Sequence, residues 1–163
     1  MSTGDVGAAE HDSGLAPPET LKQMSGLEFL SAIRDGRLPA APIAHTLDFE
    51  LSEVEHGRAL FRGTPGFAHY NPIGSVHGGW YATLLDSCMA CAVQSTLPKG
   101  SAYTTLEFKI NLVRAITGDT GPVDAEGKVV QTGRRIGVAE GRLTDGAGKL
   151  LAHGTTTCLI FPL

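Results

Sequence analysis

Hydrophobic and polar positions divide the chain into one long apolar segment and several alternating ones. Residues 80–93 contain no Gly or Pro and are apolar or small on nearly every side, which predicts a buried helix. Alternation predicts strands at residues 46–52, 57–62, 104–112, 122–132, 136–144 and 150–161. Strands joined by short turns favour an antiparallel sheet, and an apolar helix must be covered by it. The pattern therefore predicts an α+β fold in which a sheet wraps around one helix.

The N-terminal segment differs from this pattern. Residues 1–18 are mostly small or polar and include two prolines, which predicts a disordered tail. Within residues 19–38, apolar positions recur at a partial helical spacing and Gly36 is a suitable stop, so we expect one helix there. Residues 39–163 are long enough to form a single domain with a sizeable core.

Composition and charge exclude several classes of function. The formal net charge of −4 gives no overall basic surface for nucleic acid. No apolar run reaches the roughly 18 residues that a membrane span needs, and the N-terminus lacks the basic-then-apolar pattern of a secretory signal. We therefore expect a soluble, cytoplasmic protein with neither a nucleic-acid nor a membrane partner.

Cysteine and histidine spacing argues against redox and metal chemistry. The three cysteines do not form a disulfide framework. Cys88 and Cys91 have redox spacing, but they fall inside the apolar helix, which favours a packing role. The six histidines lack the paired spacing of metal ligands, so no metal is expected.

The candidate chemistry lies just before and inside the apolar helix. Asp86 is the only formal charge between Gly78 and Pro98, and an ionised carboxylate there is costly unless it is bonded or opens onto a site. Gly78 and Gly79 at the expected helix start offer backbone N–H groups that suit an anion or a developing oxyanion. With Asn71 upstream, these groups could hydrolyse an acyl compound. A capped core helix with a merely hydrogen-bonded aspartate fits the same spacing.

The residues Asn71, His77–Gly79 and Asp86 resemble, in type and spacing, the signature of the hotdog-fold acyl-CoA thioesterases of the phenylacetate-degradation (PaaI-like) group. The similarity extends over roughly residues 40–163. It implies the hotdog fold, a curved antiparallel sheet around a long central helix. It also implies hydrolysis of an acyl- or aryl-acyl-CoA, with coenzyme A as part of the substrate and no separate cofactor. The family further implies a homodimer or homotetramer with active sites at the dimer interface.

The same resemblance implies a role for each matched residue. Gly78 would donate its backbone N–H to the thioester carbonyl. Asp86 would be the general base on water or the nucleophile, and Asn71 would hold the water or the carbonyl. Thr105, which alternation places on the polar face of its strand, would reach in from a partner subunit to position the water. His77 would organise the loop and the helix start rather than act as a base.

Further residues are candidates for substrate binding. Gly79 lies beside the expected carbonyl site at the helix start. His69 and Tyr70 in the irregular loop could line a pocket or only anchor the loop. Arg134 and Arg135 form a basic pair in a turn, which is either solvated surface charge or a site for the phosphates of coenzyme A.

Two other functions stay open at this level. A hotdog dehydratase or hydratase also combines a loop histidine with a helix acid, here His69 or His77 with Asp86. A non-catalytic acyl-CoA sensor would bind the same ligand without turnover. The aromatic residues near the helix start could line an aryl pocket or belong to the core, so the acyl group is unspecified.

Overall fold

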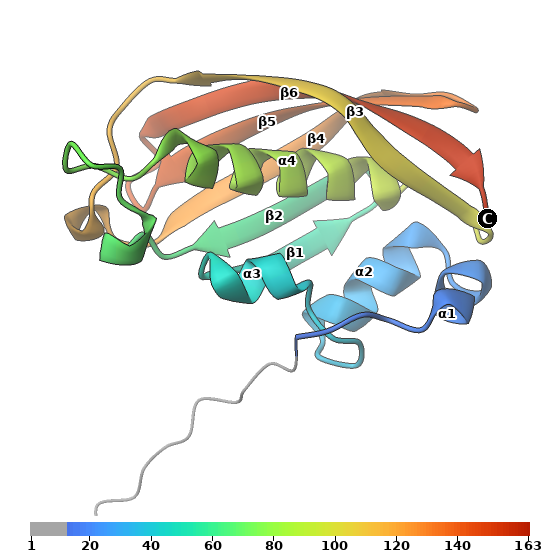
Figure 1. The fold of residues 1–163 in the computed structure, drawn as a ribbon. Coiled ribbons are helices and arrows are strands. Elements are labelled where there is room, and N and C mark those ends of the chain that lie inside the picture. The colour runs from blue at the N-terminus through green and yellow to red at the C-terminus, as the bar shows by residue number, and fades with distance from the viewer. Residues whose placement is uncertain (1–12) are drawn as a thin grey trace, which may run out of the picture.

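The computed structural model describes residues 13–163 and contains a six-stranded antiparallel sheet curved around one long helix (Figure 1). In chain order the elements are α1 (Pro18–Gln23), α2 (Gly26–Arg34), α3 (Pro42–Thr46), β1 (Phe49–Glu55), β2 (Arg58–Gly63), η1 (Phe67–His69), α4 (Gly78–Gln94), β3 (Ser101–Leu112), η2 (Gly118–Thr120), β4 (Val123–Thr132), β5 (Ile136–Asp145) and β6 (Leu150–Pro162). The strand order is β1-β2-β4-β5-β6-β3, so β1 and β3 are the edge strands. The predicted α+β architecture with a sheet wrapped around one helix is confirmed.

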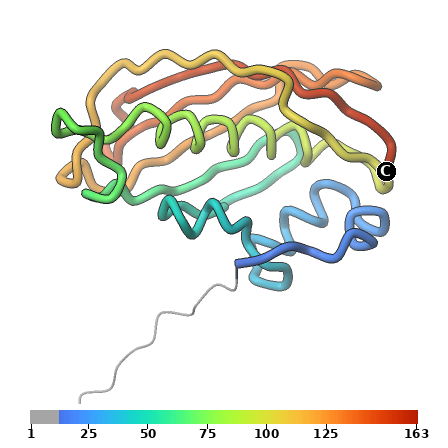
Figure 2. The backbone as a smooth tube through the Cα atoms, viewed as in Figure 1, coloured from blue at the N-terminus to red at the C-terminus, as the bar shows by residue number. Residues whose placement is uncertain are grey.

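The apolar segment forms α4, which runs along the inner face of the sheet (Figure 2). Its contact with the sheet is close because glycines in β4 and β5 face it. A Cβ atom on Gly127 would overlap the Cys88 backbone carbonyl, and one on Gly141 would lie 2.8 Å from the Met89 Cγ. Leu84 and Met89 are fully buried against this surface. The sheet therefore holds α4, and every group along it, in one position.

The N-terminal segment forms two helices where one was expected. Ser25 begins α2 with a capping box, in which its side chain accepts from the Glu28 N–H and its own N–H donates to the Glu28 carboxylate. Residues 13–18 also have defined positions, since Ser13 pairs with Ala40 and Pro18 begins α1. The rest of the predicted tail, residues 1–12, lies outside the described residues.

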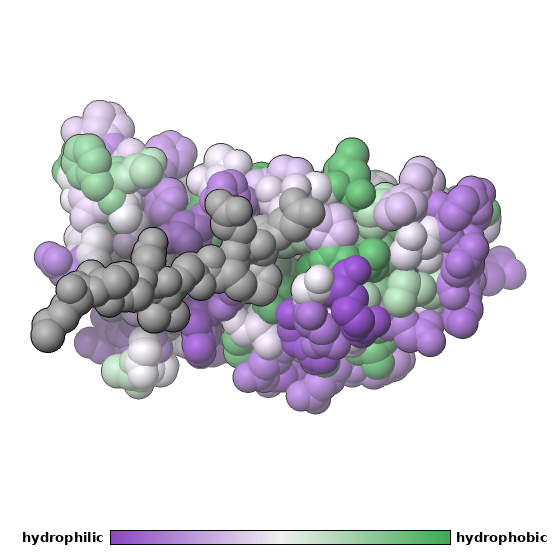
Figure 3. Space-filling model, turned by 90° about the horizontal axis from the view of Figure 1, so that it is seen from below, coloured by the Kyte–Doolittle hydropathy of each residue, from purple (hydrophilic) through white to green (hydrophobic). Residues whose placement is uncertain are grey.

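The helix α2 is docked at the C-terminal end of α4. The Gly26 N–H donates to the Leu97 carbonyl at 2.9 Å, and a Cβ atom on Gly26 would overlap the Gln94 carbonyl oxygen. The same helix contacts β1 and buries Leu30 there. The N-terminal helices therefore lie below the sheet and beside one of its edges (Figure 1). Their underside is mostly hydrophilic, with islands of apolar residues (Figure 3).

A β-bulge in β3 changes which side chains face α4. Thr105 and Glu107 are opposite consecutive residues of β6, so Leu106 is an extra residue. The Thr156 hydroxyl donates to the Glu107 carbonyl at 2.8 Å and supports the bulge. Thr105 consequently faces the helix, on the same side as Ile110. The predicted alternation, which put Thr105 and Ile110 on opposite faces, is wrong because a bulge shifts the period-two pattern by one residue.

No helix within residues 13–163 is long and apolar enough to cross a membrane.

Candidate active site

The start of α4 presents one unused backbone donor. His77 is the N-cap, and its Nδ1 accepts from the Gly79 N–H at 2.8 Å. The Trp80 N–H donates to the His77 carbonyl at 3.0 Å. Among residues 13–163, the Gly78 N–H is bonded to no protein acceptor. His77 therefore organises the helix start, and Gly78 is the glycine whose N–H is available to a ligand.

The loop before α4 is held by its aromatic and histidine side chains. His69 Nδ1 accepts from the Gly66 N–H at 3.0 Å, and the His69 ring stacks on Trp80 with a centroid distance of 5.5 Å. The Tyr70 hydroxyl accepts from the Gly118 N–H at 2.8 Å. These contacts give His69 and Tyr70 an anchoring role, and neither residue lines the cleft beside Gly78.

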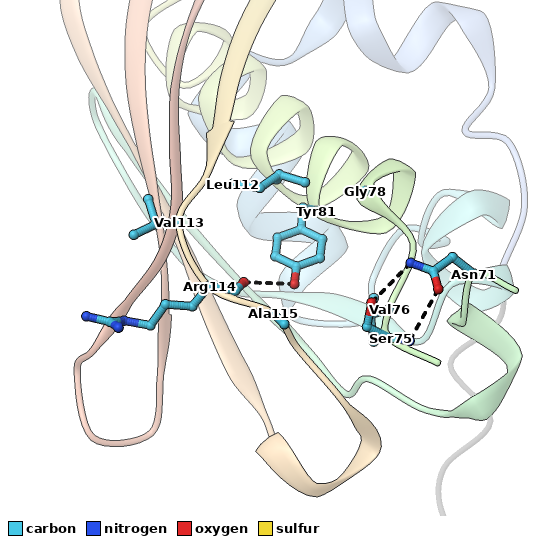
Figure 4. A pocket seen from close by; sticks show the side chains of 9 residues that line it. All are labelled: Asn71, Ser75, Val76, Gly78, Tyr81, Leu112, Val113, Arg114 and Ala115. Carbon is cyan, nitrogen blue, oxygen red and sulfur yellow. Dashed lines mark hydrogen bonds between the residues drawn. The ribbon is translucent and has the colours of Figure 1, made fainter. Parts of the chain in front are cut away.

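Asn71 shapes the turn that precedes the helix. Its Oδ1 accepts from the N–H groups of Ile73 and Ser75, and its Nδ2 donates to the Ser75 hydroxyl at 3.0 Å. The two accepted bonds fix the orientation of the amide. One Nδ2 hydrogen is left for a ligand in the cleft that Asn71 shares with Gly78 (Figure 4).

This cleft joins the start of α4 to the end of β3. Its volume is about 240 Å³, and the lining residues are Asn71, Ser75, Val76, Gly78, Tyr81, Leu112, Val113, Arg114 and Ala115. The Tyr81 hydroxyl donates to the Arg114 carbonyl at 3.0 Å, which ties the two segments together (Figure 4). The segment from Leu112 to Ala115 was not singled out in the sequence. The apolar pair Leu112–Val113 at the end of the predicted strand 104–112 was the available signal there.

Asp86 lies two turns further along α4 and is half-buried. The Thr105 hydroxyl donates to its Oδ1 at 3.0 Å. Burial raises the pKa of Asp86 above its ordinary value, and the hydrogen bond from Thr105 opposes this shift. Both residues of this hydrogen bond belong to the same chain, so a Thr105 that reached a site from a partner subunit, as predicted, would bring Asp86 with it. Asp86 and Thr105 thus form one unit.

The groups around Asp86 carry no positive charge. Its titratable neighbours are Cys88, Cys91, Tyr103 and Cys158. Burial raises the pKa of Cys91 to about 12 and also raises that of Cys158. These thiols stay protonated at neutral pH, in line with the packing role expected for Cys91. No ion pair among residues 13–163 neutralises the Asp86 carboxylate.

One chain holds two separate halves of the predicted site. Gly78 and Asp86 are eight residues apart on one helix, which is about 12 Å along the axis. The cleft beside Gly78 includes Asn71 but neither Asp86 nor Thr105. A thioester is only a few bonds long, so Gly78 and Asp86 of the same chain cannot both act on it.

The predicted phosphate-binding pair lies at the far end of the molecule. Arg134 and Arg135 are exposed in the β4–β5 turn, and the Ile160 N–H donates to the Arg135 carbonyl at 2.8 Å. Because Ile160 pairs with Tyr103, this turn lies near the beginning of β3. A second hollow of about 600 Å³ at the C-terminal end of α4 contains no residue predicted for the site.

The antiparallel sheet and the helix that it encloses define a hotdog-type fold. The central helix carries one acid, Asp86. Residues 73–152 match the family model of the thioesterase superfamily. A crystal structure of a phenylacetic acid degradation-related protein from Ralstonia eutropha JMP134 is 28% identical, covers 80% of this chain and 98% of its own, and has a TM-score of 0.73. A mutant of the phenylacetic acid degradation protein PaaI from Thermus thermophilus is 25% identical, with coverage of 72% and 97% and a TM-score of 0.65.

One curated protein is similar over a shorter part of the chain. A predicted esterase from Halobacterium salinarum is 41% identical over 69 residues, which are 41% of this chain and 44% of that protein. The chain thus matches less than half the length of that relative. Taken together with the fold, these matches place residues 73–152 in the thioesterase superfamily. The predicted resemblance to this superfamily is confirmed.

Proposed function

We propose that the protein is an acyl-CoA thioesterase whose active site forms between two copies of the chain. The observation that carries the proposal is the separation of the two half-sites on α4. Asp86 with Thr105 from one copy would face Gly78 with Asn71 from the other. Each interface would then contain two equivalent sites, because a two-fold axis repeats every contact with the roles exchanged.

The open edge of the sheet supports this arrangement. The edge strand β3 is 12 residues long, and no strand within residues 13–163 pairs with its outer side. Leu106, Phe108 and Leu112 are 56%, 41% and 51% exposed along it. A long apolar edge is a template for pairing with another strand. A second copy of β3 would cover these side chains.

The position of the two-fold axis follows from the half-sites. If Gly78 of one copy meets Asp86 of the other, the two-fold axis passes beside α4 at the point midway between these two positions, near Ala82. On β3, Leu112 lies close to Gly78, and Thr105 is bonded to Asp86. The same axis therefore crosses β3 near Phe108. The two copies of Phe108 would meet there.

Hydrolysis needs only groups already placed in the two halves. The thioester carbonyl oxygen would accept from the Gly78 N–H and the Asn71 amide, which stabilise its developing negative charge. Asp86 would take a proton from water as the water oxygen attacks the carbonyl carbon. Collapse of the tetrahedral intermediate breaks the C–S bond, and the leaving sulfur takes the proton back. Direct attack by Asp86, followed by hydrolysis of the resulting anhydride, uses the same groups.

The remaining charged residues suit the rest of the substrate. From Asp86, α4 runs about 12 Å to Gln94, toward the end of the molecule that carries Arg134 and Arg135. A pantetheine arm along this path would bring the phosphates of coenzyme A to the two guanidinium groups.

Hydrogen bonding of the two loop histidines favours hydrolysis over dehydration. His69 and His77 each use Nδ1 to accept a backbone N–H, and the His69 ring is also stacked on Trp80. A dehydratase needs one of these rings as a mobile proton carrier beside the substrate. Their structural use supports the thioesterase reaction.

A test of the shared site can remove each half separately. Gly78→Pro removes the donor while keeping the helix, because Gly78 is the first helical residue and His77 already has the extended backbone that precedes proline. Gly78→Ala is the matched control, which retains the N–H. We expect Gly78→Pro to lower kcat for thiol release about 10²–10³-fold. The alanine control should stay within a few-fold.

Mixing the two defective proteins then separates a shared site from a single-chain site. Gly78→Pro and Asp86→Asn proteins, unfolded and refolded together, should regain about a quarter of the wild-type sites, because each mixed dimer has one intact site. No recovery in verified mixed dimers would refute the shared site. Absence of thiol release from every acyl-CoA by the wild-type protein would refute the thioesterase reaction.

A further inference from the structure

We infer that Thr156 is a positioning residue for the proposed active site, because its hydroxyl holds the bulge in β3 that directs Thr105 at Asp86. Thr156 lies on the neighbouring strand β6, and its hydroxyl is bonded to the backbone of β3 rather than to the carboxylate. The inference rests on the proposed thioesterase function. It adds a residue that acts on Asp86 only through Thr105.

The bulge decides which way Thr105 points. Side chains alternate along a regular strand, so residues an odd number of positions apart face opposite sides. Thr105 and Phe108 are three positions apart, yet each pairs with a buried residue of β6. Leu106, which lies between them, is the extra residue that makes this possible. Without the bulge, Thr105 would turn away from α4 wherever Phe108 kept its place.

Thr156 is placed where it can hold the bulge. Its side chain is 1% exposed, and its hydroxyl donates to the Glu107 carbonyl at 2.8 Å. Glu107 directly follows the extra residue Leu106, so this bond fixes the backbone at the point where regular pairing resumes. A buried hydroxyl needs a hydrogen-bond partner, and here the partner is the irregular part of the next strand.

The contacts from Thr156 to Asp86 are continuous. Burial raises the pKa of the Cys158 thiol, and the hydroxyls of Thr105 and Thr156 both oppose this shift. The two threonines therefore lie beside the same buried thiol. Thr105 donates in turn to the Asp86 Oδ1 at 3.0 Å. A displacement of the bulge would consequently change this hydrogen bond first.

The pKa of Asp86 is a readout that does not depend on turnover. Burial raises this pKa and the hydrogen bond from Thr105 lowers it, so loss of the bond should raise it further. Burial also raises the pKa of every other titratable group beside Asp86, namely Cys88 and Cys91 on α4, Tyr103 on β3 and Cys158 on β6. Asp86 is therefore the group of this cluster that titrates on the acid side of neutral pH.

The experiment compares Thr156→Val, which removes the hydroxyl, with Thr156→Ser, which keeps it. The control is Thr155→Val, an exposed position on the other face of β6. NMR titration of the side-chain carboxyl carbons, with Asp86→Asn to assign the signal, should show a higher Asp86 pKa in Thr156→Val alone. In that variant kcat should fall about tenfold with KM nearly unchanged, and the acid limb of kcat/KM should move to higher pH.

A double-mutant cycle shows whether Thr156 acts through Thr105. In a Thr105→Val background, Thr156→Val should change neither kcat nor the Asp86 pKa any further. Effects that simply add would overturn the positioning role. A folded Thr156→Val protein with the wild-type Asp86 pKa would overturn it as well.

Two further measurements keep the inference separate from folding and from the proposed reaction. If Thr156→Val does not fold, Thr156→Cys, whose thiol is a weaker donor, should give a smaller pKa shift of the same sign. Absence of any shift in Thr156→Cys would overturn the role. If the wild type releases no thiol from any acyl-CoA, the thioesterase reaction is refuted, whereas a coupled rise in the Asp86 pKa would still support the position of Thr156.

Discussion

The two edges of the sheet differ in strand length, in coverage by helices and in the apolar side chains that they expose. The edge strand β1 has seven residues, carries a bulge, exposes Glu50, Glu53 and Glu55, and is flanked by α2 and α3. Arg58 pairs with two of these glutamates and, in β4, with Glu126. Charge, bulging and coverage are the means by which proteins protect an edge from pairing.

The other edge lacks most of this protection. The strand β3 is longer and exposes the apolar side chains of Leu106, Phe108 and Leu112 beside the charged Glu107 and Lys109. It also has a bulge, but there the bulge turns Thr105 toward Asp86. One edge is thus closed to association, and the other combines an apolar surface with the incomplete site. This difference supports the proposal that two copies pair at the open edge.

We expect the largest effect on association and activity from a negative charge placed among the exposed apolar side chains of β3. Phe108→Glu would place two like charges together near the proposed two-fold axis. We expect a monomer in sedimentation at micromolar concentration and a loss of kcat/KM of at least about 10²-fold, because each chain would keep only half a site. Glu50→Gln on β1, whose acid makes no ion pair among residues 13–163, should change neither. An active Phe108→Glu monomer would contradict the shared site.

The chemistry at the open edge is tested by Asp86→Asn. The amide can neither take a proton nor attack, so kcat should fall by at least about 10²-fold. Binding of acyl-CoA should persist, because Gly78 and the cleft remain. The measurements are kcat and the Kd of the same substrate in a variant with an intact circular dichroism spectrum. Turnover within a few-fold of the parent would remove Asp86 from the mechanism.

A smaller effect is expected at the remote arginines. Replacing Arg134 and Arg135 together by Ala should raise KM for acyl-CoA more than it lowers kcat, because a remote phosphate is bound equally in the ground and transition states. An acyl thioester of pantetheine, which lacks the nucleotide, serves as the matched substrate and should be affected much less. Equal losses on the two substrates would exclude phosphate binding by this pair.

The smallest effect concerns stability and pH. Burial raises the pKa of Asp86 in the folded chain above the unfolded value of about 3.9. The folded state therefore binds the proton more tightly, and ionisation destabilises it as the pH rises through the folded pKa. We expect Asp86→Asn to raise the melting temperature at pH 7, with a smaller gain at pH 3. A lower melting temperature at pH 7, measured by calorimetry, would show that the ionised carboxylate stabilises the fold.

Local patterns were sufficient to predict most of the elements and to single out the candidate groups of the proposed site. The apolar run at 80–93 and the glycines before it predicted α4, and Asp86 stood out as a lone charge in that run. The boundary between α1 and α2 at Ser25 also had a local signal, the Ser25–Glu28 capping box. We predicted a single helix because the helical spacing of apolar residues continues across this boundary. These features were readable because helix spacing, turn residues and caps act over a few positions of the chain.

Only the tertiary structure decided which of these groups meet. The bulge at Leu106 depends on pairing with β6 and brings Thr105 to Asp86 within one chain. The cleft joins Gly78 to Leu112, which are 34 positions apart, and both contacts depend on how the whole sheet curves around α4. Strand register and sheet curvature result from the summed packing of distant residues. An alternating sequence pattern does not show at which residue a β-bulge will form.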